Sequence, residues 1–317
     1  MSNPARIDVH QHIVPPDYAN WLTQHGIKPG GGFLPKWSVE DAINMMDEHG
    51  IATGILSVST PGVHLGNDAE ARVKAREVNE FAAQVVSNHP HRFGFFATLT
   101  LPDVDGAIAE AVYAMEELHA AGVVLLANTH GRYLGEKDFD PLMQELNCRH
   151  AVVFVHPSEL PGPSVQGVPS FAADFLLDTT RAAINLIVSG TMTRYTNLKV
   201  ILSHAGGFIP YAAHRMAPVC SPDGNIETGL ENLRRFYFDT ALSSSPTALP
   251  SLLAFADPSH ILYGSDSPFA PVQAVSRFTD GLDTYPFDNQ LRSAINHSNA
   301  EALFPQFAKL LTPISNS

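Results

Sequence analysis

The sequence predicts one α/β domain, residues 1–317, built as a closed (β/α)8 barrel, or TIM barrel, with extended loops at its C-terminal face. Three observations predict this fold. Eight short apolar segments follow one another along the chain, amphipathic segments separate them, and no repeat or low-complexity linker divides the chain. Strands that are apolar on both faces and alternate with helices indicate a parallel sheet, and eight such units indicate a barrel. An open, doubly wound sheet is the alternative.

The predicted strands are short runs rich in β-branched and aromatic residues, which favour extended backbone. In chain order they are RIDVH at 6–10, GILSVS at 54–59, FGFFAT at 93–98, GVVLLA at 122–127, VVFVH at 152–156, KVILSH at 199–204, FYFDT at 236–240 and HILYGS at 260–265. Because amphipathic segments separate them, we expect these strands to run parallel.

The predicted helices have apolar residues at helical spacing. They cover 39–49, 69–88, 105–121, 140–149 and 177–195. Gly50 and Gly122 stand where helix C-caps are expected. Two other segments, 15–36 and 158–170, are rich in Gly and Pro and follow the first and fifth strands. Binding loops of barrel enzymes leave from these strand ends, so we expect both segments to form the walls or lid of a pocket.

Composition and charge exclude several classes of protein. Hydrophobic residues make up 44% of the chain and charged residues 16%, as in globular proteins. No apolar run reaches the roughly 18 residues that a membrane span needs, and RIDVH follows Met1 too closely for a signal peptide. We therefore expect a cytoplasmic protein without a membrane anchor. A net charge of −13 argues against a nucleic-acid partner, although it permits a small anionic substrate at a buried cation.

Polar side chains gather at the C-terminal ends of four predicted strands. His10 and His12 end the first strand, and side chains at i and i+2 of an extended backbone point the same way. His156 ends the fifth strand, His204 ends the sixth, and Asp266 follows the eighth. Because barrel strands end at one rim, we expect these side chains to lie together. Imidazole and carboxylate groups suit Zn, Mn, Fe, Co or Ni better than Ca or Mg.

The two cysteines, Cys148 and Cys220, are too few for a disulfide framework or a thiolate metal site, so any metal needs nitrogen and oxygen ligands. Each candidate ligand also has an ordinary interpretation. An isolated HxH pair is weak evidence for a metal, and Asp266 before Ser267-Pro268 can form an Asx-turn. The shared position at strand ends favours a metal site. A closed, non-catalytic structural site is a further alternative, against which the additional His204 and the two long loops argue.

Four motifs, RIDVHQH, FVHP, ILSHAGG and LYGSDSP, resemble those of the amidohydrolase superfamily in identity and order. They are most similar to the branch that contains aminocarboxymuconate semialdehyde decarboxylase. The stretches WSVEDAINMMDEHGIATGILSVSTPG and NHPHRFGFFATL resemble the 6-methylsalicylate decarboxylases most closely. The resemblance runs from Arg6 to about Leu303. It implies a metal-dependent, non-oxidative decarboxylase, a carboxy-lyase, of a small aromatic acid of the 2-hydroxybenzoate type, such as 6-methylsalicylate.

The resemblance also implies roles for individual residues. The family's metal ligands match His10, His12, His156 and Asp266. His204 matches the active-site histidine that contacts the metal-bound water or the substrate, and Phe269 matches an aromatic residue of the pocket. The chain departs from two-metal relatives because GVVLLA ends without a lysine or an acid, so we expect one divalent ion, Zn or Mn. It offers only Lys28 and Lys36 where aminocarboxymuconate semialdehyde decarboxylase has an arginine, which favours a different carboxylic acid.

Two reactions fit these residues. In a decarboxylase, Asp266 is the candidate acid that protonates the ring, and His204 orients the substrate or shares the proton relay. In the alternative, a metal-bound hydroxide hydrolyses a lactone or an amide with His204 as base. The resemblance, rather than the spacing of the residues, favours decarboxylation.

Substrate-binding residues are less sharply marked. The candidate apolar walls are Phe33, Trp37, Phe171, Phe175 and Phe269. The candidate partners of the substrate carboxylate are Arg132, Arg194 and Arg215. Arg215 resembles a position at which relatives place an arginine near a subunit boundary, which implies a homodimer.

Overall fold

A computed structural model describes residues 4–29, 32 and 34–308. Within this part of the chain, eight parallel strands form one sheet in the order β1-β2-β3-β4-β7-β8-β9-β10. Their bounds are β1 Arg6–His12, β2 Ile51–Ser57, β3 Phe93–Thr98, β4 Gly122–Leu126, β7 Val152–His156, β8 Lys199–Leu202, β9 Tyr237–Asp239 and β10 Ile261–Leu262. The backbone just beyond β10 closes onto β1 through a parallel bridge between Gln11 and Ser267 and a 3.0 Å hydrogen bond from Val9 to Tyr263. The predicted barrel is therefore confirmed.

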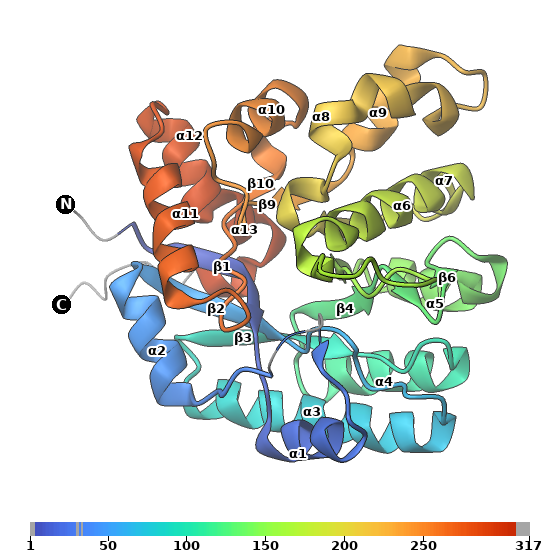
Figure 1. Cartoon of the computed structure of the whole chain (residues 1–317), viewed down its shortest axis with the longest axis vertical. Helices are drawn as coiled ribbons and strands as arrows, with labels where there is room; N and C mark the ends of the chain where they lie inside the picture. The colour runs from blue at the N-terminus through green and yellow to red at the C-terminus, as the bar shows by residue number, and fades with distance from the viewer. Residues whose placement is uncertain (1–3, 30–31, 33, 309–317) are drawn as a thin grey trace.

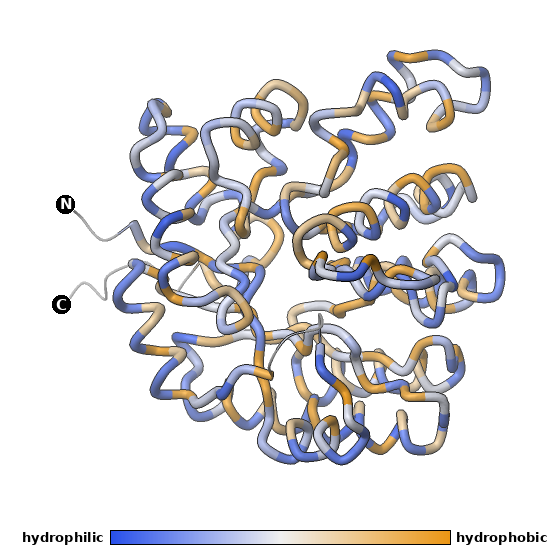
Figure 2. The backbone as a smooth tube through the Cα atoms, in the orientation of Figure 1, coloured by the Kyte–Doolittle hydropathy of each residue, from blue (hydrophilic) through white to orange (hydrophobic). Residues whose placement is uncertain are grey.

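The helices surround the strands (Figure 1), and hydrophobic and hydrophilic positions alternate along them (Figure 2). They include α2 Val39–Glu48, α3 Asp68–Asn88, α4 Val104–Glu116, α5 Asp140–Cys148, α6 Asp174–Val188, α8 Ile209–Met216, α9 Ile226–Arg234, α10 Ala248–Phe255 and α11 Val272–Thr284. Side-chain caps explain several helix starts: the Ser38, Asn67 and Asp103 side chains accept backbone hydrogen bonds at the first turns of α2, α3 and α4.

Two expectations about the elements need correction, and one helix was not predicted. The predicted helix at 177–195 is two helices, α6 and α7 Thr191–Arg194, because Gly190 adopts a left-handed φ of 77° between them. Gly122 begins β4 instead of capping a helix, and a side chain there would clash with the backbone of Val152 on the neighbouring strand. The segment 15–36 contains a helix, α1 Pro16–Gln24, with proline at its first position.

The C-terminal segment closes the N-terminal end of the barrel. Phe304 and Phe307, in and beside the short helices α13 Asn299–Leu303 and α14 Pro305–Ala308, pack against apolar side chains that fill the barrel interior, among them Phe96 and Phe154. A side chain at Gly94, near the start of β3, would collide with the Phe307 ring. This packing leaves the opposite, C-terminal end of the strands for a binding site.

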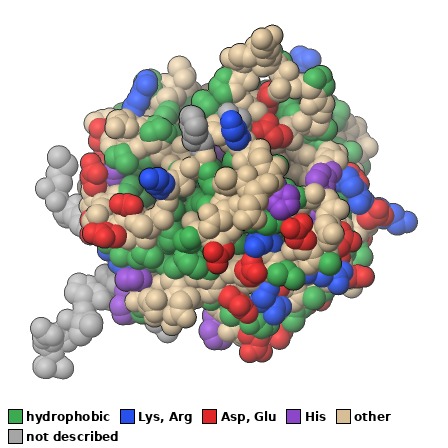
Figure 3. All heavy atoms as spheres, turned by 60° about the horizontal axis from the view of Figure 1, so that its bottom comes forward, with side chains coloured by type: hydrophobic (Ala, Val, Ile, Leu, Met, Phe, Trp, Pro, Cys, Tyr) green, Lys and Arg blue, Asp and Glu red, His purple; other side chains and the backbone are tan. Residues whose placement is uncertain are grey.

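The surface shows no concentration of one charge on the face drawn in Figure 3, where Lys and Arg side chains are interspersed with Asp and Glu. None of the described helices is long and apolar enough to cross a membrane.

Gly207, in the turn after β8, allows the chain to pass close to α6. Its φ is 65°, and a side chain there would clash with the carbonyl oxygen of Leu176 and the hydroxyl of Thr180. We expect Gly207→Ala to lower the free energy of unfolding by about 2–3 kcal/mol, since it combines backbone strain with a clash. Urea denaturation measures this. Gly26→Ala is the matched control, because Gly26 has a φ of 67° but nothing within 4 Å. Equal losses in both variants would contradict the prediction.

Candidate metal centre and active site

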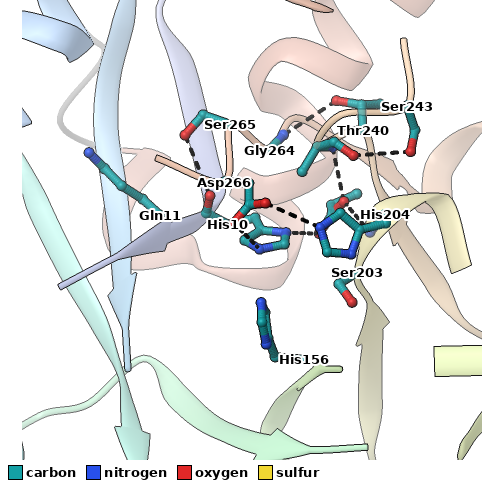
Figure 4. Close-up of polar contacts among 12 residues, drawn as sticks. His10, Gln11, His156, Ser203, His204, Thr240, Ser243, Gly264, Ser265 and Asp266 are labelled. Carbon is teal, nitrogen blue, oxygen red and sulfur yellow. Dashed lines mark hydrogen bonds and ion pairs between the residues drawn. The ribbon is translucent and has the colours of Figure 1, made fainter. Parts of the chain in front are cut away.

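Four side chains meet at the C-terminal end of the barrel. His10, His12, His156 and Asp266 each offer one ligand atom, and these atoms all lie within 4.8 Å of one another. The Nε2 atoms of His10 and His12 are 3.1 Å apart, and Asp266 Oδ1 lies 3.3 Å from the first and 3.2 Å from the second. Figure 4 shows His10, His156 and Asp266 pointing toward one another. All four residues are buried, so the structure brings together the whole set that the strand ends predicted.

Local backbone geometry aims these side chains. The pairing of β1 with β2 is irregular between Asp8 and Gln11, the region from which His10 projects. Asp266 and His204 adopt left-handed φ values of 62° and 52°. Such values are uncommon for residues other than glycine and cost free energy, and they cluster at functional sites. The backbone N–H of Asp266 donates to the carbonyl oxygen of His10 over 2.8 Å, which ties the end of the last strand to the first.

The outer hydrogen bonds fix how each imidazole presents itself. The Nδ1 atoms donate to oxygen acceptors: His10 to Asp239 Oδ2 at 2.7 Å, His12 to the carbonyl of Ser57 at 3.2 Å, and His156 to the carbonyl of Pro157 at 2.9 Å. A neutral imidazole that donates through Nδ1 presents its Nε2 lone pair toward the cluster, the arrangement that metal-binding histidines adopt. Two nitrogens bound to one ion at about 2.0–2.1 Å lie about 3 Å apart. The donor set therefore fits a divalent cation.

The electrostatics of the site also favour a cation. Burial disfavours a charged imidazole, but the carboxylates of Asp239 and Asp266 outweigh it and raise the pKa of His10 to about 10. Burial would raise the pKa of Asp266, yet His10, with hydrogen bonds from His12 and His204, holds it well below its ordinary value. Burial, followed by the neighbouring imidazoles, lowers the pKa of His156. Two carboxylates thus concentrate negative potential at the cluster, which favours a positive charge there.

His204 lies beside the cluster with one ring nitrogen still available. Its Nε2 atom is 3.3 Å from Asp266 Oδ2, and its backbone N–H donates to Asp239 Oδ1 over 2.9 Å. Its buried Nδ1 atom has no hydrogen-bond partner within the described residues. A buried polar atom without a partner is costly unless a bound group satisfies it. His204 is therefore placed to hydrogen-bond a bound molecule.

A cavity of about 820 Å³ opens above the cluster. His156, His204, Asp266 and Phe269 line it, together with the hydroxyl-bearing Ser59 and Thr60 and many apolar side chains. Of the predicted apolar walls, Phe171, Phe175 and Phe269 line this cavity. Phe33 lies outside the described residues.

The structure does not bring two predicted substrate residues to the cavity. Trp37 packs edge-on against Phe81, with ring centroids 6.1 Å apart, and Arg215 is exposed on α8. The alternatives Arg132 and Arg194 form ion pairs with surface acids. Among the described residues that line the cavity, none is Lys or Arg.

Sequence reasoning missed two buried acids. Asp239 ends β9 and accepts hydrogen bonds from the His10 ring and from the backbone N–H groups of His204 and Ala241. Asp8 accepts from Ser265 through both its hydroxyl, at 2.5 Å, and its backbone, and burial raises its pKa to about 7. The signal for Asp239 was present: FYFDT carries an acid at the same rim as the histidines, and that acid is fully buried.

Comparison with known proteins identifies the family. The amidohydrolase family model matches residues 7–306, nearly the whole chain. The chain belongs to the amidohydrolase family. Among the relatives of this amidohydrolase, the 6-methylsalicylic acid decarboxylase of Penicillium expansum is 37% identical over 319 residues, which cover 97% of this chain and 98% of the relative. The 6-methylsalicylic acid decarboxylase acuB of Aspergillus aculeatus is 40% identical, covering 86% and 87% of the two chains. The resemblance inferred from the motifs is confirmed.

Solved structures share the fold of this amidohydrolase. A crystal structure described as Amidohydrolase II superposes with a TM-score of 0.90 at 30% identity, covering 95% of this chain and 99% of the other. A dihydroxybenzoic acid decarboxylase from Polaromonas sp. JS666, crystallised with manganese and 2-nitroresorcinol, superposes with a TM-score of 0.80 at 23% identity, covering 98% and 99%. The barrel and its closure are thus shared with experimentally determined structures.

Proposed function

We propose that this amidohydrolase is a metal-dependent, non-oxidative decarboxylase of a 2-hydroxybenzoate-type acid such as 6-methylsalicylate. The observation that carries the proposal is the buried cluster of three imidazoles and one carboxylate, with His204 beside it, at the base of a mostly apolar cavity. The two relatives named as 6-methylsalicylic acid decarboxylases, at 37% and 40% identity, support the reaction and the substrate class.

His10, His12, His156 and Asp266 are the proposed ligands of one divalent ion. When bound, this ion supplies a positive charge that anchors the substrate carboxylate and its ortho hydroxyl and stabilises the phenolate. Zn and Mn both suit the ligand types. Manganese in the Polaromonas decarboxylase supports Mn for this chain, and reconstitution with each ion separately decides between them.

Loss of CO2 requires that a proton replace the carboxylate on the ring. Asp266 is the proposed acid that delivers this proton to C1, since its Oδ2 atom faces His204 at 3.3 Å while Oδ1 faces the cluster. Because its pKa is held low, Asp266 is a carboxylate at rest and carries the proton only in passing, from His204 to the ring. The protonated ring carbon then releases CO2, and the electrons of the broken C–C bond restore the aromatic ring. His204 hydrogen-bonds the substrate and returns a proton to Asp266 from solvent. One proton is consumed in each turnover.

The cavity suits an aromatic acid whose carboxylate is bound at the metal centre and whose ring lies against apolar side chains. Phe269 lies edge-on to His12, with ring centroids 5.3 Å apart, and offers an apolar wall beside the cluster. Since the described lining contains no Lys or Arg, none of these residues offers the substrate carboxylate a permanently charged side chain. Its charge is balanced at the metal centre.

Removal of the metal is expected to abolish activity. Dialysis against a chelator should lower the release of CO2 from 6-methylsalicylate at least a hundredfold, and one equivalent of Mn²⁺ or Zn²⁺ should restore it. Chromatography of the product should show 3-methylphenol in equal amount to CO2. Simple lactones are incubated in parallel, because metal-dependent acid release from a lactone without CO2 release would favour the hydrolase alternative. Decarboxylation that is indifferent to the chelator would contradict the proposal.

Three further statements are proposals of the same kind: that residues 1–317 fold as one domain, that the protein is a homodimer, and that it resides in the cytoplasm. Limited proteolysis, sedimentation at micromolar concentration and cell fractionation test them in turn. A sedimentation profile with monomer alone would remove the dimer.

A further inference from the structure

The cavity extends well beyond the space that one small aromatic ring needs. Its volume is about 820 Å³. A cavity of about 150 Å³ accommodates benzene, and a ring with carboxylate, hydroxyl and methyl groups needs about 300 Å³, the lower end of the range for ligand pockets. More than half of the cavity therefore lies beyond the ring that the proposed function places at the metal centre.

The outer part of the cavity, here called the apolar arm, is carried by helices instead of strand ends. It is lined by Leu176, Phe208, Tyr211, Ala248, Ala274 and Phe278. These residues belong to α6, to α8 and the residue before it, to α10 and to α11; α8, α10 and α11 can be followed in Figure 1. Tyr211 is 85% exposed and Phe208 is 37% exposed. Large apolar side chains gathered around a cavity mouth mark a binding surface.

The polar groups of the cavity are segregated at its inner end. His156, His204 and Asp266 lie there, whereas the arm adds only hydroxyl groups, those of Tyr211, Thr247 and Ser251. Hydroxyl groups can be satisfied by water at the mouth, but they cannot balance a second anionic group. Since no Lys or Arg belongs to the described lining, the arm fits an uncharged, hydrophobic group.

We propose that the preferred substrate is a 2-hydroxybenzoate that carries an apolar substituent of several carbons, and that this substituent lies in the apolar arm. The inference rests on the proposed function, which places the carboxylate and hydroxyl groups at the metal centre. Each methylene group removed from water strengthens binding about fourfold. Because the arm contacts the substituent equally in the ground state and the transition state, it lowers KM and leaves kcat unchanged.

Steady-state kinetics of the manganese-loaded protein with matched acids test this inference. The value of kcat/KM for 6-pentyl-2-hydroxybenzoate should exceed that for 6-methyl-2-hydroxybenzoate at least tenfold, through KM. An acid with a side chain of equal length that ends in a carboxylate should lose this gain, because the arm offers no cation to it.

Substitutions on α11 locate the effect. Ala274→Trp fills the arm and should bring the ratio of kcat/KM for the pentyl and methyl acids to about one. Val272→Trp is the control on the same helix: Val272 is 46% exposed and does not line the cavity, so the ratio should stay as in the unsubstituted protein. Turnover of the methyl acid with no gain for the pentyl acid overturns the inference and leaves the proposed function standing. Release of CO2 from neither acid overturns both.

Discussion

Asp266→Asn is expected to reduce decarboxylation of 6-methylsalicylate about a thousandfold while the metal stays bound. Asparagine retains a carbonyl oxygen that can occupy the place of Oδ1, 3.2–3.3 Å from the Nε2 atoms of His10 and His12. It has no proton to give to the ring, and general acid catalysis contributes about 10²–10⁴ to a rate. The loss should therefore fall on kcat.

The measurement compares kcat at saturating manganese, with the metal content of the same samples determined by mass spectrometry. Asp223→Asn, which alters an exposed acid far from the cluster in sequence, is the control and should keep full activity. Near-normal turnover by Asp266→Asn with one metal ion per chain would eliminate Asp266 as the acid.

Asp239→Asn is expected to weaken metal binding about 10–100-fold, the range found when an outer hydrogen-bond partner of a metal-binding histidine is lost. Asp239 accepts through both oxygens: Oδ2 from His10 Nδ1 at 2.7 Å, and Oδ1 from the backbone N–H groups of His204 and Ala241 at 2.9 and 3.0 Å. An asparagine can satisfy only one side. If its NH2 group faces His10, the imidazole must carry its proton on Nε2, where a metal cannot bind.

The other orientation of this asparagine is no better, since its NH2 group would then face the backbone donors of His204 and Ala241. Asp239 is therefore a positioning residue for two parts of the site, the His10 ring and the backbone at His204. Metal titration of the chelator-treated variant measures the dissociation constant. Asp103→Asn is the matched control, because Asp103 is also a buried acid, caps α4 and pairs with Arg72. It should lower stability and leave the metal affinity unchanged; an unchanged affinity in Asp239→Asn would contradict its role.

The strands and the cluster could be predicted from the sequence, because the residue pattern of each short segment marks a strand and shows which side chains stand at its end. Runs such as VVFVH reveal buried strands, and the rule that barrel strands end at one rim brings His10 and His156 together although 146 positions separate them (156 − 10). The helix break at Gly190 was not predictable with the same certainty, because a single glycine inside a periodic segment is compatible with a continuous helix.

Residues whose role depends on the path of long loops could not be placed from the sequence. Trp37 and Arg215 follow segments whose course is set by tertiary packing, and the structure puts one against Phe81 and the other on the surface. The motif FYFDT places Asp239 at the rim, but its contact with His10 joins positions 229 apart and becomes visible only in the structure. The apolar arm likewise arises only where helices from distant parts of the chain meet.

The position of the cation is the most direct test of the site. Crystals of zinc-loaded protein, measured on both sides of the zinc absorption edge, locate the ion by anomalous scattering. One strong peak per chain is expected, about 2.0–2.2 Å from the Nε2 atoms of His10, His12 and His156 and from a carboxylate oxygen of Asp266. An anomalous peak at another place in the chain would contradict the metal centre on which the proposed reaction depends. The same holds if protein that still releases CO2 shows no peak between these four side chains.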